Sequence, residues 1–162
     1  MSPVVDPLDV IVEDTGEGAF QVEVLTNGMR FLIDEHAAAG GLGSGPAPYQ
    51  LLGAALGACT VITLRLYAER KGVALERVRA SVRHRRDPVS GRDVFTRDIR
   101  LAGELSDAER GRLMEIAERC PVHRTLTAGT AIETTAADER TRAAILALAS
   151  RAVSPAATEA AA

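Results

Sequence analysis

The feature that most constrains this chain is a mostly apolar stretch, residues 49–71, with the pattern of one long helix. It reads YQLLGAALGACTVITLRLYAERK and is followed by Gly72, a residue type that typically terminates helices. Its first half is apolar on all sides, which predicts a helix buried on most of its surface. Small residues four positions apart predict that another helix approaches closely: Gly53 with Gly57, and Ala54 with Ala58.

The segment before this helix predicts β-strands. Residues 8–13 read as a short edge strand, and residues 18–25 alternate apolar and polar side chains, as a half-buried strand does. Asn27-Gly28 is a strong signal for a two-residue hairpin turn, which makes residues 29–34 the return strand. Four glycines and two prolines within residues 40–48 predict an irregular loop.

The segment after the helix predicts a second hairpin and further helices. Residues 75–86 alternate and are followed by a turn, so residues 94–105 are expected to pair with them. Ser106 and Glu109 form a capping box that opens a helix through residue 119, and Pro121 could start another short helical turn. A final strand is expected at 130–135 and an amphipathic helix at 138–153. This order predicts an α+β fold with antiparallel hairpins, comprising a main domain at 1–136 and a helical extension with a frayed tail at 137–162.

Composition excludes several functional classes. The net charge of −3, the pI of about 5.7 and an aromatic content of 3% do not indicate a nucleic-acid surface. The longest apolar run, residues 51–64, is too short to span a bilayer, and the N-terminus lacks the pattern of a secretory signal. We therefore expect a cytoplasmic protein with neither a membrane nor a nucleic acid as its partner. The glycine-rich loop lacks the spacing of a phosphate-binding motif.

Two cysteines, Cys59 and Cys120, are the strongest candidates for chemistry. In a reducing compartment such a pair is either two buried small side chains or a redox centre. Cys120-Pro121-Val122-His123 resembles a CxxC redox motif in which histidine replaces the second cysteine. The same spacing suits half of a zinc site, but Cys59, Cys120 and His123 supply three ligands and no fourth is evident.

Two motifs together resemble the OsmC/Ohr family of thiol-dependent hydroperoxide reductases. They are GPAPYQLLGAALGACTVITLRLYAERKG around Cys59 and RCPVHRTL around Cys120, with RFLIDE before the glycine-rich loop. The resemblance covers roughly residues 20–135. It implies an OsmC-like fold around the long central helix and an intertwined homodimer with active sites at the subunit interface.

The resemblance also implies a reaction cycle. Cys59 attacks an organic hydroperoxide, or possibly hydrogen peroxide, and becomes a sulfenic acid. Cys120 then resolves it as an intrachain disulfide, and a dithiol reductant restores both thiols. No metal and no organic cofactor is expected.

This chain departs from the family where an arginine and a glutamate poise the attacking thiol. The glutamate is expected nine or ten residues before the first cysteine, where this chain has Gln50 and Tyr49. The only arginine before the long helix is Arg30. We therefore take Arg30 and Gln50 as candidates for the site beside the two cysteines.

Two other functions remain compatible with these residues. The missing carboxylate and the apolar helix would suit a non-catalytic protein that binds a small, lipid-like molecule beside the cysteines. A redox sensor that passes its disulfide to a regulator would use the same cysteines but turn over slowly.

Overall fold

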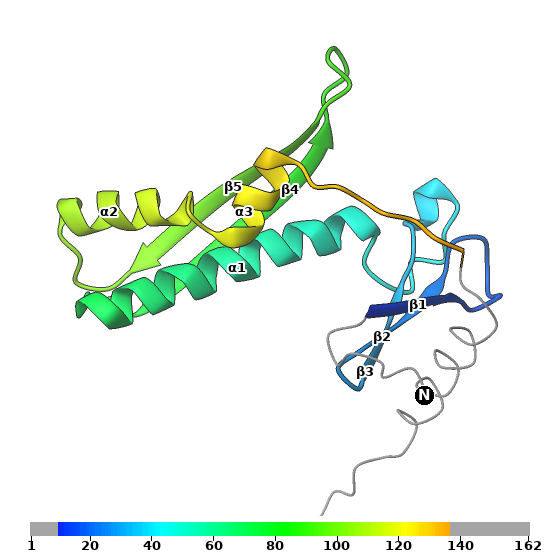
Figure 1. The fold of residues 1–162 in the computed structure, drawn as a ribbon, viewed down its shortest axis with the longest axis horizontal. Helices are drawn as coiled ribbons and strands as arrows, with labels where there is room; N and C mark the ends of the chain where they lie inside the picture. The colour runs from blue at the N-terminus through cyan, green and yellow to red at the C-terminus, as the bar shows by residue number, and fades with distance from the viewer. Residues whose placement is uncertain (1–9, 137–162) are drawn as a thin grey trace, which may run out of the picture. The chain divides into compact units, whose positions relative to one another are not determined.

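The computed structural model describes residues 10–136 and has an α+β fold (Figure 1). Its elements follow the chain in the order β1 (Val10–Asp14), β2 (Val22–Thr26), β3 (Met29–Ile33), a short 3-10 helix (Ala37–Ala39), α1 (Pro48–Lys71), β4 (Arg77–Arg86), β5 (Asp93–Ala102), α2 (Asp107–Ala117) and α3 (Pro121–Ala128). The chain divides into two compact units, residues 1–47 with 133–162 and residues 48–132. Each unit is described by itself.

The first unit contains a three-stranded antiparallel sheet in the order β1-β2-β3. The predicted hairpin turn is confirmed, because Asn27 and Gly28 both have positive φ angles, 46° and 74°. Both central residues of the favoured two-residue hairpin turn need such angles. The expected strand at 18–25 begins later, at Val22, because residues 18–20 form a turn.

The glycine-rich loop is organised around one buried carboxylate, that of Asp34. Its two oxygens accept hydrogen bonds from the backbone amides of Glu35 (2.8 Å), Leu42 (2.9 Å) and Ser44 (3.1 Å) and from the Ser44 hydroxyl (3.0 Å). Gly41 lies so close to the Glu35 carbonyl that a Cβ atom there would collide with it. The glycines therefore serve close backbone packing.

Protonation of Asp34 should loosen this loop. Burial opposes ionisation, but the hydrogen bonds from Ser44, Glu35 and Leu42 outweigh it and lower the pKa of Asp34. A lowered folded-state pKa contributes stability above the unfolded value of about 3.9 and loses it as pH falls through the folded value. We expect the Leu42 and Ser44 amides to exchange hydrogen several-fold faster in Asp34→Asn than in the native chain at neutral pH. Exchange measured by mass spectrometry tests this, and equal rates in both proteins would contradict it.

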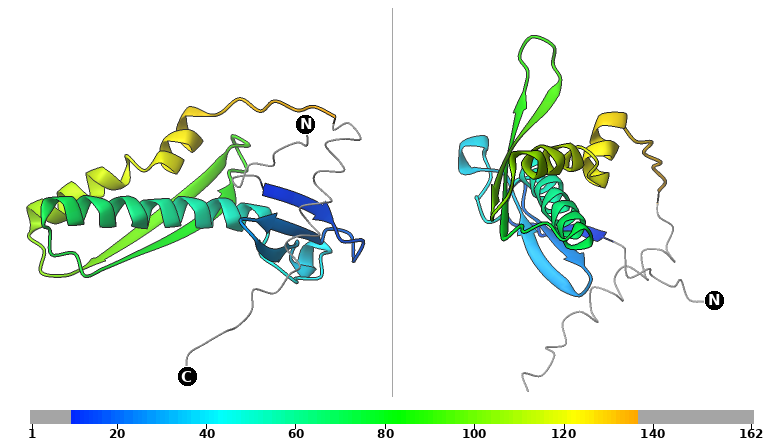
Figure 2. Two further views of the ribbon diagram at one scale, coloured as in Figure 1. Left: turned by 60° about the horizontal axis from the view of Figure 1, so that its bottom comes forward. Right: turned by 90° about the vertical axis from the view of Figure 1, so that its left-hand side faces the viewer.

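In the second unit, α1 packs against the β4–β5 hairpin. The two strands pair antiparallel along their full length, with Val82 opposite Arg97 in the register. Alternate residues of both strands face α1, as the alternation in the sequence predicts. Figure 2 shows the helices of this unit gathered on one side of the hairpin.

The small residues of α1 contact a strand where the sequence suggested a helix. A Cβ atom on Gly53 would lie 3.5 Å from a methyl group of Val82, and one on Gly57 would meet Val82 and Ala80. The expectation of a close helix partner at these glycines is therefore wrong for the described chain. Because Gly53 and Gly57 have no side chains, Val82 of β4 can approach the backbone of α1 closely.

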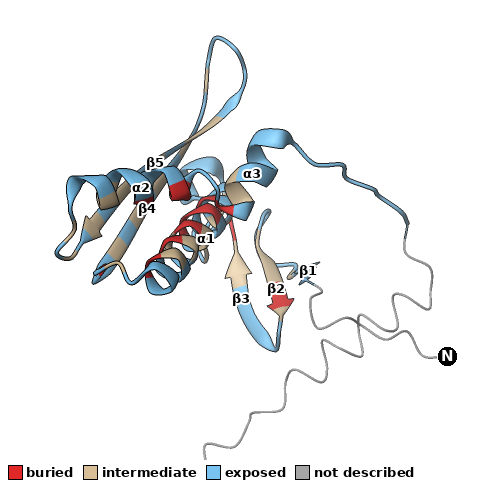
Figure 3. Ribbon diagram, turned by 60° about the vertical axis from the view of Figure 1, so that its left-hand side comes forward, coloured by how far each residue is buried: buried red, intermediate tan, exposed pale blue. Residues whose placement is uncertain are grey.

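The core of this unit joins α1, α2 and the hairpin. Its fully buried members include Leu64 and Leu113, surrounded by further apolar side chains: Ala68, Leu75, Ile116 and Ala117. Figure 3 shows the buried residues concentrated on α1 and α2. The capping box predicted from the sequence is present, because Ser106 and Glu109 bind each other's backbone amide.

One long face of α1 remains uncovered, contrary to the expectation of burial on most sides. Leu52, Ile62 and Leu66 are 42%, 58% and 46% exposed. The helix α1 is long and apolar enough to cross a bilayer, but the core helix of a globular domain can have the same length and composition. In this structure it packs against β4, α2 and α3.

The predicted strand at 130–135 is absent. Residues 129–136 have no regular secondary structure, and Ile132 is 84% exposed, so no packing holds this segment in a sheet. The helix predicted at 138–153 lies outside the described residues.

Candidate active site

The fold brings the two cysteines together from separate helices. Cys59 lies in the middle of α1, and Cys120 is the N-cap residue of α3. Both are free thiols, and they lie close enough for each to shift the pKa of the other. Cys120 is fully buried, whereas Cys59 is half-buried beside the uncovered face of α1. A molecule arriving from solvent would therefore meet Cys59 first.

The surroundings of Cys120 stabilise a thiolate. Burial opposes its ionisation, but neighbouring donors outweigh burial and lower the pKa of the Cys120 thiol below its ordinary value: the Cys59 thiol, the amides of His123 and Val122, and the Thr60 hydroxyl. The two amides are available to the sulfur because Cys120 precedes the first turn of α3, where helix amides lack internal partners.

Cys59 experiences the opposite effect. Burial raises the pKa of the Cys59 thiol, and so do the hydrogen bond to Cys120 and the charge on that sulfur. The Val122 amide and the Thr63 hydroxyl oppose the rise without cancelling it. The two thiols thus have pKa values shifted in opposite directions, that of Cys120 downward and that of Cys59 upward.

The pH dependence of Cys59 reactivity should show this arrangement. Because only a thiolate attacks peroxide, we expect the oxidation rate of Cys59 to keep rising above the ordinary thiol pKa of about 8.5. Cys120→Ala removes two causes of the raised pKa, so the midpoint for Cys59 should move to lower pH. Dimedone trapping of the oxidised thiol across a pH series measures both midpoints, and a higher midpoint in the variant would contradict the arrangement.

A buried arginine near the cysteines escaped the sequence reasoning. The Arg97 side chain is 8% exposed, and its guanidinium donates to the Thr60 hydroxyl at 2.7 Å and to Glu118 at 2.9 Å. The other oxygen of Glu118 lies 3.3 Å from His123 Nε2. The signal was available in the sequence, because Arg97 alternates with Phe95 and Ile99 on the apolar face of a predicted strand.

The two other candidates lie elsewhere in the chain. Arg30 belongs to the first unit, where it forms an ion pair with Glu23 on the neighbouring strand. Gln50 lies in the first turn of α1, nine residues before Cys59, which is about 13 Å along a helix axis. A role for either residue in the chemistry stays a prediction.

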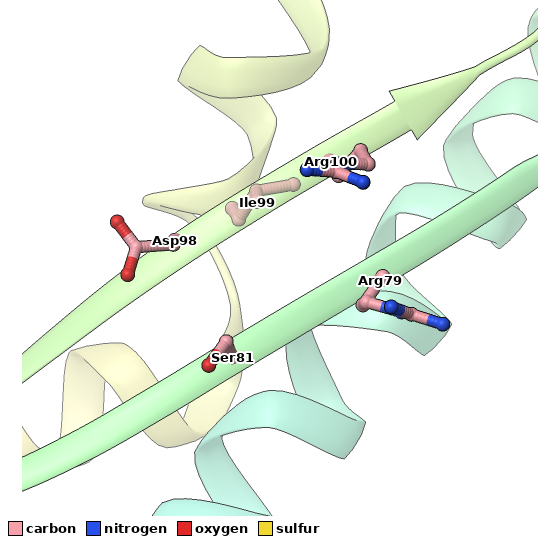
Figure 4. Close-up of a pocket in the computed structure, with 5 residues that line it drawn as sticks. All are labelled: Arg79, Ser81, Asp98, Ile99 and Arg100. Carbon is pink, nitrogen blue, oxygen red and sulfur yellow. The ribbon is translucent and has the colours of Figure 1, made fainter.

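A hollow of about 300 Å³ lies on the outer face of the hairpin (Figure 4). Arg79, Ser81, Asp98, Ile99 and Arg100 line it, so two of its three charged side chains are basic. Arg79 and Arg100 are direct partners in the register and alternate with the residues that face α1. The hollow is therefore separated from the cysteines by the sheet. Among residues 10–136, no group of three or more His, Cys, Asp or Glu side chains is arranged to hold a metal ion.

These observations define a class of protein: an α+β domain with a hydrogen-bonded dithiol between its central helix and a following short helix. The family model described as OsmC-like protein matches residues 41–135, more than half of the chain. The chain therefore belongs to the OsmC-like family. No curated protein sequence matches it significantly.

Solved structures show the same fold at low sequence identity. An OsmC-like protein from Mycoplasma pneumoniae is 19% identical, with a TM-score of 0.62 over 74% of this chain and 86% of that one. The organic hydroperoxide resistance protein OsmC from Legionella pneumophila is 22% identical, with a TM-score of 0.58 over 76% and 91%. The organic hydroperoxide resistance protein OhrB of Bacillus subtilis is also 22% identical, with a TM-score of 0.51 over 72% and 87%.

Proposed function

We propose that this protein is a two-cysteine peroxidase that reduces organic hydroperoxides. The observation that carries the proposal is that Cys59 and Cys120, 61 positions apart in the sequence, lie near each other in the folded chain, close enough for each thiol to shift the pKa of the other. Their unequal environments also suit unequal roles. Cys59 is partly accessible and can meet the substrate, whereas Cys120 is buried and is stabilised as the thiolate that attacks next.

The cycle balances with these two residues alone. The Cys59 thiolate attacks the terminal oxygen of the peroxide, the O–O bond breaks, and the departing alkoxide takes a proton to leave as an alcohol. Cys59 is then a sulfenic acid. The Cys120 thiolate attacks its sulfur, forming the S–S bond and releasing hydroxide, which is protonated to water. A dithiol reductant returns both thiols by exchange, as expected in a reducing cytoplasm.

The choice of organic hydroperoxides is supported by two proteins of similar fold, which are organic hydroperoxide resistance proteins. The exposed apolar residues of α1 around Cys59 also support this choice, because they would bury the alkyl group of an organic hydroperoxide away from water. No step of the proposed cycle requires a metal or an organic cofactor.

We propose further that the functional unit is a homodimer formed through the uncovered face of α1. Residues 52, 55, 59, 62 and 66 recur at alternating steps of three and four, the spacing of a helix–helix seam. Cys59 lies within this seam, so a second copy would border the site and reduce its access to water.

Thiol counting tests the peroxidase proposal. The reduced protein receives one equivalent of cumene hydroperoxide or of hydrogen peroxide, and free thiols and intact mass are followed over time. We expect both thiols to be lost as one intrachain disulfide, faster with the organic peroxide. Two thiols still free after prolonged exposure would contradict the peroxidase and favour a ligand-binding role. One oxidation without turnover in excess dithiol would favour a redox sensor.

A further inference from the structure

Arg97 is the one buried guanidinium whose contacts lead to the cysteine pair within residues 10–136. It projects from the inner face of β5 and donates to the oxygen of the Thr60 hydroxyl, which lies beside the Cys120 sulfur. The Thr60 hydroxyl itself donates to the Leu56 carbonyl at 2.7 Å, one helical turn earlier. Thr60 therefore stands between the cation and the thiol, with a fixed position on α1.

The direction of these hydrogen bonds gives the contact a chemical meaning. Because Arg97 can only donate, the Thr60 oxygen accepts from it, and the single hydroxyl proton has two acceptors to choose between, the Leu56 carbonyl and the Cys120 sulfur. A thiolate on Cys120 is the stronger acceptor, since charged hydrogen bonds exceed neutral ones. The Arg97 guanidinium polarises the Thr60 hydroxyl, and this favours a negative charge on the Cys120 sulfur.

Glu118 holds the guanidinium in this position. It is the C-cap residue of α2, and it binds Arg97 with one oxygen while the other lies near His123. Glu118 itself is 61% exposed, so it neutralises Arg97 less than a buried carboxylate would. The positive charge of Arg97 is therefore only partly neutralised, and it still acts on the buried Thr60 and Cys120.

We propose that Arg97 is a positioning residue for the second half of the redox cycle, acting through Thr60 to orient Cys120 as the nucleophile. The inference rests on the proposed peroxidase cycle and assigns a step within it. The step is attack of the Cys120 thiolate on the Cys59 sulfenic acid, in which the S–S bond forms, the S–O bond breaks and hydroxide leaves as water. Attack of Cys59 on the peroxide should not slow when Arg97 is lost, because a less charged Cys120 would oppose the ionisation of Cys59 less.

Single-turnover kinetics with cumene hydroperoxide test the assignment. Samples quenched with dimedone report the Cys59 sulfenic acid, and intact mass reports the disulfide. In Arg97→Met we expect disulfide formation to slow by about tenfold or more, as loss of a charged hydrogen bond predicts, so that trapped sulfenic acid accumulates. The first step should not slow, because a less charged Cys120 opposes the ionisation of Cys59 less. Arg97→Lys keeps a cation and should recover part of the second step.

Two further variants separate the relay from damage to the fold. Thr60→Val removes the hydroxyl but leaves the Arg97–Glu118 ion pair, and it should slow the same step. Arg100→Met removes an exposed arginine from the outer face of the same strand and should change neither step. Native disulfide rates in both Arg97→Met and Thr60→Val would overturn the proposal, and so would equal slowing of both steps in correctly folded variants.

A peroxide-free measurement distinguishes failure of this inference from failure of the proposed cycle. In a Cys59→Ser background, ultraviolet thiolate absorbance follows the ionisation of Cys120 alone. Adding Arg97→Met should move its midpoint to higher pH by about one unit. An unchanged midpoint overturns the role of Arg97 whether or not the native protein reduces peroxides. A shifted midpoint in a protein that ignores peroxide would contradict only the peroxidase.

Discussion

Cys59→Ser is expected to lower peroxide turnover by about a thousandfold or more, because a serine hydroxyl cannot form the sulfenic acid that starts the cycle. Cys120→Ala should behave differently. It should undergo one oxidation per chain and stop before a disulfide, since the resolving thiol is gone. Peroxide consumption with excess dithiol, together with intact mass, measures both outcomes.

The contrast between the two variants assigns the roles. Ala58→Ser, a change at the exposed neighbour of Cys59 on α1, should retain native turnover and serves as the control. If Cys59→Ser still consumed peroxide while Cys120→Ala did not, the attacking thiol would be Cys120. That result would require the buried Cys120 sulfur to become accessible, which the described structure does not provide.

Ile62→Glu is expected to convert the proposed dimer into monomers. Ile62 is 58% exposed in the described chain, so the change should cost the monomer little stability. In a helix–helix seam the same carboxylate would be buried without a partner, which should weaken association by about a hundredfold or more. Sedimentation equilibrium over a range of concentrations measures the change.

A matched change on another surface separates the seam from a general effect of charge. Thr96→Glu adds the same charge on the outer face of β5, and it should leave the dimer intact. A native protein that remains a monomer at all concentrations would contradict the dimer. Dissociation of both variants to the same degree would show that net charge, rather than the α1 seam, controls association.

The local elements were largely predictable because their signals are contained in short stretches of sequence. Gly72 ends α1 with a φ of 66°, Asn27 and Gly28 form the hairpin turn, and Ser106 with Glu109 caps α2. These features depend on backbone angles and hydrogen bonds between near neighbours. The strand expected at 130–135 is wrong because its apolar residues find no neighbouring strand, and a strand requires one.

The chemistry of the site was only partly predictable. The motifs around Cys59 and Cys120 identified both thiols, and the family model confirms the resemblance on which they rest. Their unequal ionisation could not be predicted, since it depends on which donors surround each sulfur after folding. The Thr60 hydroxyl and the first amides of α3 reach Cys120 only in the folded chain.

The sequence by itself determined the long central helix, the two hairpins, the dithiol and the family. Tertiary structure alone decided that Gly53 and Gly57 contact β4, that Arg97 reaches Thr60, and that the pKa values of Cys59 and Cys120 shift in opposite directions. The physical reason is the range of the interactions involved. Helix ends and turns depend on residues a few positions apart, whereas the state of a buried thiol depends on donors brought from distant parts of the chain.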